Sequence, residues 1–136
     1  MLPDFLSMQN LKSLKTILVI TTDKVYKNLN NKKFFNEKDE LGGDDVYSYS
    51  KASVEMLVNA YKKSFFGKKI NIATARAGNV IGGGDWSEFR IIPDFIRAYI
   101  SKKIFIIRNP NHVRPWQHVM DCVFGYILLA ENVSRS

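Results

Sequence analysis

The chain has 136 residues, of which 46% are hydrophobic, a composition that can bury a moderate core and that is unlike a disordered polypeptide. The formal net charge of +7 favours an anionic partner, which leaves nucleic acid, a membrane surface and a phosphorylated metabolite open. A single cysteine, Cys122, and the lack of any apolar run of about 18 residues exclude an internal disulfide framework and a transmembrane helix, and we expect a cytoplasmic protein.

The first predicted element is a strand over residues 15–20, a short β-branched apolar run typical of a strand buried on both faces. It ends at the polar tetrad Thr-Thr-Asp-Lys of residues 21–24. Residues 27–45 are polar and rich in asparagine, and they predict a long loop. Loops of this length inside a compact domain are often functional.

A helix is predicted over residues 47–66, followed by a strand over residues 70–75. Apolar side chains recur in the helix at spacings of three and four, which predicts one stripe facing the core. The stripe comprises Val54, Leu57, Val58, Tyr61 and Phe65. The strand runs directly into the glycine-rich segment 76–86.

The last predicted elements are a helix over residues 92–101, a strand over residues 104–107 and a helix over residues 118–133. Strands that alternate with helices predict an α/β fold with a parallel sheet. In such sheets, ligands bind beyond the carboxyl ends of the strands. Two predicted strands end in the polar tetrad and in the glycine-rich segment, so we expect the functional site there.

Tyr47 and Lys51 stand four residues apart at the start of the predicted helix, so their side chains share one helical face. Tyrosine is a poor base at neutral pH because it ionises only at about pH 10. A neighbouring ammonium favours the phenolate, and a second positive charge such as an oxidised nicotinamide would add to the effect. The pattern indicates an acid–base site, although the same spacing also occurs on ordinary exposed helices.

Five blocks of the sequence, in this order, resemble the extended short-chain dehydrogenase/reductase enzymes that act on nucleotide sugars. The blocks are TTDKVY at residues 21–26, LGG at 41–43, YSYSK at 47–51, RAGNVIGGGDW at 76–86, and RNP at 108–110 followed by RPWQH at 114–118. The lysine after Asp23, the triple glycine and the Pro-Trp-Gln-His run resemble the branch of 4,6-dehydratases that act on CDP-glucose. Related dehydratases usually carry a glutamate in place of this lysine.

The resemblance implies a role for each polar residue near the first strand. Tyr47 takes the proton of the C4 hydroxyl while hydride leaves C4 for NAD, Thr22 hydrogen-bonds the same region, and Lys51 favours the phenolate. Lys24 and Asp23 are the implied base at C5 and acid at the C6 hydroxyl, so that water leaves and hydride returns to C6. These roles require a neutral lysine and a protonated aspartate. The alternative is an ordinary surface Asp-Lys dipeptide.

Four residues are the implied contacts of the nucleotide-sugar substrate. Asn79 lies near the sugar diphosphate, and Arg114 clamps it because a guanidinium can bind two phosphate oxygens at once. Arg90 and Arg108 are weaker candidates, since each fits equally well as a surface charge. Arg76 is different, because it fits a role in tying the end of the second strand to neighbouring loops.

NAD is the implied cofactor, with Tyr47, Lys51 and Val80 as its contacts. Enzymes of this class bind the pyrophosphate at a glycine-rich G-x-x-G-x-x-G turn between an N-terminal strand and helix. No such turn occurs in the chain. We therefore expect residues 1–136 to be a partial NAD-dependent epimerase/dehydratase domain from within a longer enzyme, a portion that binds NAD poorly and is inactive alone.

Two other interpretations stay open. A small basic module that binds nucleic acid would explain the charge, but the lysine doublets are dispersed and the aromatic residues follow core periodicity. An epimerase or reductase of the same fold has no need of the Asp23-Lys24 pair. We therefore expect a CDP-sugar as the partner, with no nucleic acid, membrane or metal, and the resemblance leaves room for a homo-oligomer of the full-length enzyme.

Overall fold

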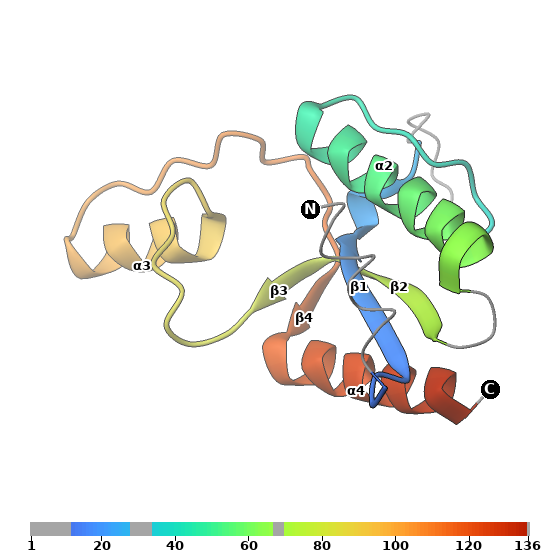
Figure 1. The fold of residues 1–136 in the computed structure, drawn as a ribbon. Coiled ribbons are helices and arrows are strands. Elements are labelled where there is room, and N and C mark those ends of the chain that lie inside the picture. The colour runs from blue at the N-terminus through green and yellow to red at the C-terminus, as the bar shows by residue number, and fades with distance from the viewer. Residues whose placement is uncertain (1–11, 28–33, 67–69, 136) are drawn as a thin grey trace. The chain divides into compact units, whose positions relative to one another are not determined.

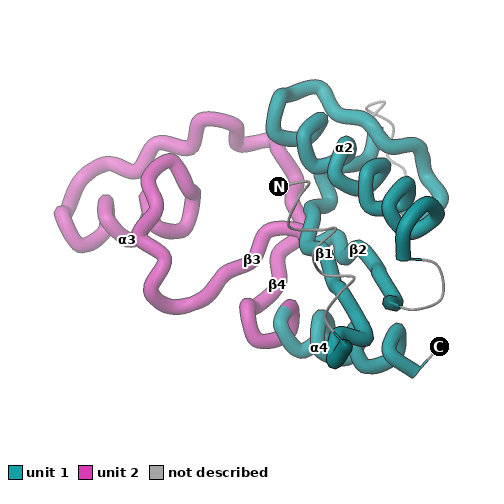
Figure 2. Tube along the Cα trace, viewed as in Figure 1, with its two compact units in different colours: residues 1–77, 123–136 teal, residues 78–122 magenta. Residues whose placement is uncertain are grey.

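The computed structural model describes residues 12–27, 34–66 and 70–135 (Figure 1). Contacts between Cα atoms divide the chain into two compact units, which Figure 2 colours separately. Unit 1 comprises residues 1–77 and 123–136, and unit 2 comprises residues 78–122. Each unit is described by itself.

Unit 1 is built on two parallel strands, β1 (Thr16–Thr22) and β2 (Asn71–Ala77). Their register runs from Thr16 opposite Asn71 to Thr22 opposite Ala77. Both predicted strands are confirmed, and each extends two residues further at its carboxyl end than the apolar run alone predicted. The added residues are Thr21 and Thr22 in β1 and Arg76 and Ala77 in β2, which are polar or small, so a search for apolar runs did not include them. They extend the pairing of the two strands into the polar tetrad.

The segment between these strands contains one turn of 3-10 helix, η2 (Asp23–Val25), and then α2 (Val46–Tyr61) (Figure 1). Helix α2 continues as a π-helical turn, η3 (Lys62–Phe66). A helix between two parallel strands is the usual parallel crossover. The predicted helix over residues 47–66 is therefore confirmed, with a change of helical geometry near its end.

The core of unit 1 lies between α2 and the strands. Its buried members are Val58, Tyr61, Phe66, Ile70 and Ile72, and Leu14, Ile17, Val19 and Val54 pack against them. The prediction that Leu57 and Phe65 share this stripe is wrong, since both side chains are exposed in the structure. The buried face of α2 follows Ser48, Ala52, Glu55, Val58 and Tyr61. Leu57 lies to one side of that face, and the π-turn shifts the phase of the helix before Phe65.

Unit 2 contains a second parallel pair, β3 (Asn79–Ile81) and β4 (Trp116–His118), together with α3 (Ile91–Ile100). Helix α4 (Val119–Arg135) begins in unit 2 and continues into unit 1. The predicted strand over residues 104–107 is wrong. Phe105 packs edge-on against Phe95 of α3, with ring centroids 5.5 Å apart. Ile104, Ile106 and Ile107 are exposed, so this apolar run forms neither a paired strand nor a buried segment.

The predicted fold class is confirmed: strands pair in parallel and helices connect them, as in a Rossmann-like sheet. In the described ranges, no helix is both long enough and apolar enough to cross a lipid bilayer.

Candidate active site

The carboxyl end of β1 presents the polar tetrad in a fixed turn. Thr22 is buried, and its hydroxyl donates to Oδ1 of Asp23 at 3.2 Å and accepts from the backbone N–H of Lys24 at 3.4 Å. Thr22 thereby acts as the N-cap of η2, a position that favours a short hydroxyl side chain. Val25 is fully buried beneath this turn. The backbone of Asp23 and Lys24 is therefore held in a defined conformation directly after the strand.

Tyr47 lies in the first turn of α2, and the residue is 51% exposed. The ring has two ammonium groups beside it. Nζ of Lys24 lies 5.6 Å from the ring centroid, and Nζ of Lys51 lies 6.0 Å from it. Both distances are within the range of cation–π attraction. The structure thus brings three of the predicted catalytic residues together, two from α2 and one from η2.

The start of α2 is fixed by Asp45, whose carboxylate accepts from the backbone N–H of Ser48 at 3.0 Å and from its hydroxyl at 2.7 Å. These hydrogen bonds hold the pKa of Asp45 below its ordinary value, and the charge of Lys24 acts in the same direction. Gly43 has φ of +150°, and a Cβ there would overlap the Cβ of Ser48. The close approach of Gly43 to Ser48 therefore requires glycine and helps to place the first turn, which carries Tyr47.

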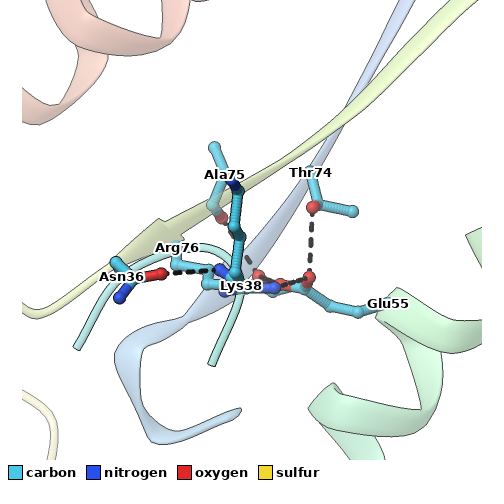
Figure 3. Close-up of polar contacts among 7 residues, drawn as sticks. Asn36, Lys38, Glu55, Thr74, Ala75 and Arg76 are labelled. Carbon is cyan, nitrogen blue, oxygen red and sulfur yellow. Dashed lines mark hydrogen bonds and ion pairs between the residues drawn. The ribbon is translucent and has the colours of Figure 1, made fainter. Parts of the chain in front are cut away.

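Glu55 is the functional-site residue that sequence reasoning missed. Its side chain is 4% exposed, and its carboxylate accepts from Nε of Arg76 at 2.8 Å and from Nη2 of Arg76 at 2.6 Å (Figure 3). The hydroxyls of Thr21 and Thr74 lie 2.6 Å and 3.2 Å from the same carboxylate. Burial works against ionisation, but the hydrogen bonds from Arg76 and Thr21 outweigh it and keep the pKa of Glu55 below its ordinary value.

The sequence contained a signal for this carboxylate. Ala52, Glu55 and Val58 are spaced three residues apart, so Glu55 lies on the buried face of α2. A charged residue in phase with a buried face predicts a partner of opposite charge, because an unpaired buried charge is costly. Arg76 at the end of β2 is that partner.

Arg76 also contacts an aromatic pair. Its Cζ lies 4.8 Å from the ring centroid of Tyr26. The ring of Phe35 stacks on that of Tyr26, with the two centroids 4.8 Å apart. Tyr26 follows η2 directly, and its backbone pairs with Leu41. The prediction that Arg76 ties the end of β2 to neighbouring loops is confirmed for the segment that follows η2, whereas its ion pair with helix α2 was not predicted.

Asn79, Val80 and Arg114 lie together in unit 2. Asn79 and Val80 belong to β3 and pair with Trp116 and Gln117 of β4. The backbone N–H of Asn79 donates to the carbonyl oxygen of Pro115 at 3.0 Å, which places Asn79 next to the segment carrying Arg114. A Cβ on the preceding Gly78 would lie 2.7 Å from Cγ of Pro115, so glycine permits this approach.

Arg90 and Arg108 occupy different positions in unit 2. Arg90 is the N-cap residue of α3, and its side chain is exposed and makes no capping hydrogen bond. Arg108 donates from Nη2 to the carbonyl oxygen of Phe89 at 3.1 Å, and its guanidinium lies 5.7 Å from the centroid of the Phe89 ring. Arg108 therefore already has a structural contact within the chain, whereas Arg90 projects from the start of a helix.

The ammonium groups at Tyr47 fit a negatively charged or hydroxyl-rich ligand. Within residues 12–27, 34–66 and 70–135, neither Lys24 nor Lys51 takes part in an ion pair. Two cations beside a half-exposed phenol at the carboxyl end of a parallel strand are the arrangement expected where a nucleotide cofactor and its substrate meet. The residues present are thus compatible with bound NAD.

Comparison with known proteins gives a consistent result. The model of the NAD dependent epimerase/dehydratase family matches residues 4–136. CDP-glucose 4,6-dehydratase of Salmonella typhimurium is 39% identical over an alignment of 133 residues, and the match covers 93% of this chain and 37% of that protein. This chain therefore spans well under half the length of that relative.

Two solved structures extend the comparison. The structure of dTDP-glucose 4,6-dehydratase from Bacillus anthracis in complex with NAD superposes with a TM-score of 0.80 and 26% identity, over 93% of this chain and 40% of that one. UDP-N-acetylglucosamine 4-epimerase from Methanobrevibacter ruminantium has a TM-score of 0.78 and 24% identity, over 96% of this chain and 42% of that one, a likeness of fold alone. NAD is thus confirmed as the cofactor of the family. With its parallel strands, its Tyr47-Lys51 helix and a family match over nearly its whole length, the chain belongs to the NAD dependent epimerase/dehydratase family.

Proposed function

We propose that this chain is the catalytic and substrate-binding portion of a nucleotide-sugar 4,6-dehydratase that converts CDP-glucose to CDP-4-keto-6-deoxyglucose and water. In this proposal residues 1–136 form part of one NAD-dependent epimerase/dehydratase domain. The observation that carries the proposal is the proximity of Nζ of Lys24 and Nζ of Lys51 to the ring of Tyr47. The 39% identity to the Salmonella dehydratase, over most of the chain, supports the same reaction.

Tyr47, Lys51 and Val80 are the proposed contacts of the cofactor. When bound, the nicotinamide supplies a reversible hydride acceptor for the sugar. The contribution of Lys51 is then to keep positive charge beside the Tyr47 ring, where its Nζ lies 6.0 Å from the centroid. That charge favours the phenolate over the neutral phenol.

The first step of the proposed reaction is oxidation at C4. The oxygen of Tyr47 removes the proton of the C4 hydroxyl, and the hydroxyl of Thr22 hydrogen-bonds the same sugar oxygen. The phenolate becomes a neutral phenol as it takes the proton, the electrons of the O–H bond form the C4=O bond of the 4-keto sugar, and the hydrogen on C4 would leave as hydride to the bound nicotinamide. For Thr22 this role requires exchange of the hydrogen bond that its hydroxyl donates to Asp23.

The second step is loss of water across C5 and C6. The 4-keto group makes the C5 proton acidic, Lys24 in its neutral amine form removes that proton, and Asp23 in its protonated form donates a proton to the C6 hydroxyl as it leaves. The electrons of the C5–H bond form the C5–C6 double bond, and those of the C6–O bond leave with water. Return of the hydride to C6 and of the proton from Lys24 to C5 would then give the 6-deoxy sugar and regenerate oxidised NAD. The distance of 5.6 Å between Nζ of Lys24 and the Tyr47 centroid supports action of both residues on one sugar ring.

Binding of the CDP-sugar is proposed for residues of unit 2. Asn79 and Arg114 are the stronger pair, because the pairing of β3 with β4 brings their segments together. A guanidinium is well matched to the two oxygens of a diphosphate group. Arg90 and Arg108 are proposed as further phosphate contacts, and for Arg108 this requires exchange of its contact with Phe89.

A sugar 4-epimerase of the same fold is the second candidate, and the likeness to the Methanobrevibacter epimerase motivates it. An epimerase would use Tyr47 and Thr22 but would need no acid and base at C5 and C6. The contact of Lys24 with the Tyr47 ring, with Asp23 next to Lys24 in the chain, therefore favours dehydration.

A chimera tests the proposal directly. The present chain replaces the matching segment of the Salmonella enzyme, and the purified chimera is incubated with NAD and CDP-glucose. We expect mass spectrometry to detect a product that has lost one water, and we expect the Tyr47→Phe chimera to lose the activity by orders of magnitude. A product of unchanged mass with inverted C4 would support the epimerase. A folded chimera without either product would contradict both functions.

A further inference from the structure

Tyr47, Lys51 and Glu55 stand at intervals of four residues along one face of α2. Tyr47 is half exposed, whereas the side chain of Glu55 is almost completely buried. Glu55 lies about two helical turns, or roughly 12 Å, from Tyr47. It is therefore too distant along the helix to be the proton acceptor for the same sugar atoms as Tyr47.

The carboxylate of Glu55 is held by side chains from both strands. Thr21 of β1 and Arg76 of β2 are direct partners in the parallel register, and Thr74 lies two residues before Arg76 on β2. Residues paired across a sheet or separated by two along a strand point to the same face. Among the described residues, the donors to Glu55 thus come from the face of the sheet that α2 covers. Figure 3 shows Thr74 and Arg76 directed at the Glu55 carboxylate.

The contacts of Arg76 form a closed path through the candidate site. From Glu55 the path passes to Arg76, then to the ring of Tyr26, which directly follows η2. Within η2, Lys24 contacts the ring of Tyr47. Tyr47 and Glu55 belong to the same helix, α2, so the series of contacts ends where it began. The helix and the 3-10 turn are therefore linked at two places, through Arg76 and through Tyr47.

We propose that Glu55 is a positioning residue, which fixes the rotation and axial position of α2 over the carboxyl end of β1 and so keeps Tyr47 beside Lys24. The chemical part of this inference rests on the proposed function. Both carboxylate oxygens are engaged by a planar guanidinium, and such a bidentate pair fixes orientation as well as distance. Apolar packing by Val58 and Tyr61 on the same helix face does not define rotation in this way.

The variant Glu55→Gln tests the inference in the chimera, because one oxygen becomes an NH2 group that cannot accept from Arg76 or Thr21. We expect kcat to fall by about 100-fold with little change in KM for CDP-glucose, as misplacement by about 1 Å can produce. Val58→Ala is the control, a core substitution that lowers stability without touching the carboxylate. At a temperature where both variants are folded, we expect Val58→Ala to keep its kcat.

A second readout does not depend on activity. In the 136-residue chain, we expect nuclear Overhauser contacts between the Tyr47 ring and the side-chain methylenes of Lys24. These contacts should persist in Val58→Ala and disappear in Glu55→Gln. If Glu55→Gln does not fold, Thr21→Val provides a milder change, because it removes the donor from β1 only.

The outcomes separate the two proposals. An inactive wild-type chimera contradicts the proposed function, and the nuclear Overhauser contacts then decide the positioning role alone. Equal loss of kcat in Glu55→Gln and Val58→Ala, or unchanged contacts between Tyr47 and Lys24 in both Glu55→Gln and Thr21→Val, would overturn the positioning role.

Discussion

Arg76 binds Glu55 through two parallel hydrogen bonds, from Nε at 2.8 Å and from Nη2 at 2.6 Å. The pair joins the end of β2 to the middle of α2, and little of either side chain is exposed. Burial of two charges is costly, and the attraction between them compensates only when the geometry is good. This pair has such geometry, because the guanidinium fork faces both carboxylate oxygens.

The first prediction concerns the stability of this pair. Arg76→Met should lower the free energy of unfolding by about 3–5 kcal/mol, because it leaves the buried carboxylate unpaired. The double variant Arg76→Met with Glu55→Leu should recover part of this loss, since no buried charge remains. Urea unfolding of the four proteins in the cycle measures the coupling. Strictly additive losses would show that the pair does not act as a unit.

The second prediction concerns acid pH. Although burial alone would raise it, the pKa of Glu55 lies below the ordinary value of 4.5 because Arg76 and Thr21 hydrogen-bond the carboxylate. A lowered pKa in the folded state means that stability is present above pH 4.5 and is lost as pH falls through the folded-state pKa. The difference in unfolding free energy between the wild type and Glu55→Gln should therefore shrink as pH falls below 4.5. A difference that stays constant with pH would contradict the lowered pKa.

The third prediction concerns the turn before α2. Gly43→Ala should destabilise the chain by about 1–3 kcal/mol, because the backbone has φ of +150° and the new methyl would overlap Ser48. Gly83→Ala is the matched control, since an added Cβ there meets nothing within 4 Å. Its effect should stay within about 0.5 kcal/mol. Thermal or urea unfolding compares the two, and equal effects would contradict a specific role of Gly43.

Much of the fold could be predicted from periodicity. The β-branched run before Thr21, the helix after Asp45 and the strand before Arg76 are each apolar in the pattern of their structure, and all three form where expected. The strands β3 and β4 escaped prediction because they are only three residues long and contain polar residues. Their existence depends on their pairing with each other, which no local pattern records.

The candidate site could be predicted only where it depends on local helix geometry. Tyr47 and Lys51 share one helix face by their spacing, so their proximity follows from local geometry. The approach of Lys24 to Tyr47 depends on how α2 packs over the end of β1 and could be expected only from the family resemblance. Glu55 was missed because a helix-face pattern built from apolar residues alone omits a buried charge.

The fourth prediction separates the two steps of the proposed reaction and tests the central claim, that Tyr47 and Lys24 act in turn on one sugar ring. Lys24→Ala and Tyr47→Phe are introduced separately into the chimera, and each is mixed with NAD and CDP-glucose at enzyme concentrations close to that of the sugar. The reaction is stopped with acid, and the sugar nucleotides are identified by mass spectrometry.

For Lys24→Ala, we expect a 4-keto sugar that keeps its C6 oxygen, because oxidation at C4 proceeds without the base needed at C5. For Tyr47→Phe, we expect unchanged CDP-glucose, because the C4 hydroxyl keeps its proton. Formation of the dehydrated 6-deoxy product by Lys24→Ala at the rate of the unmodified chimera would contradict the account.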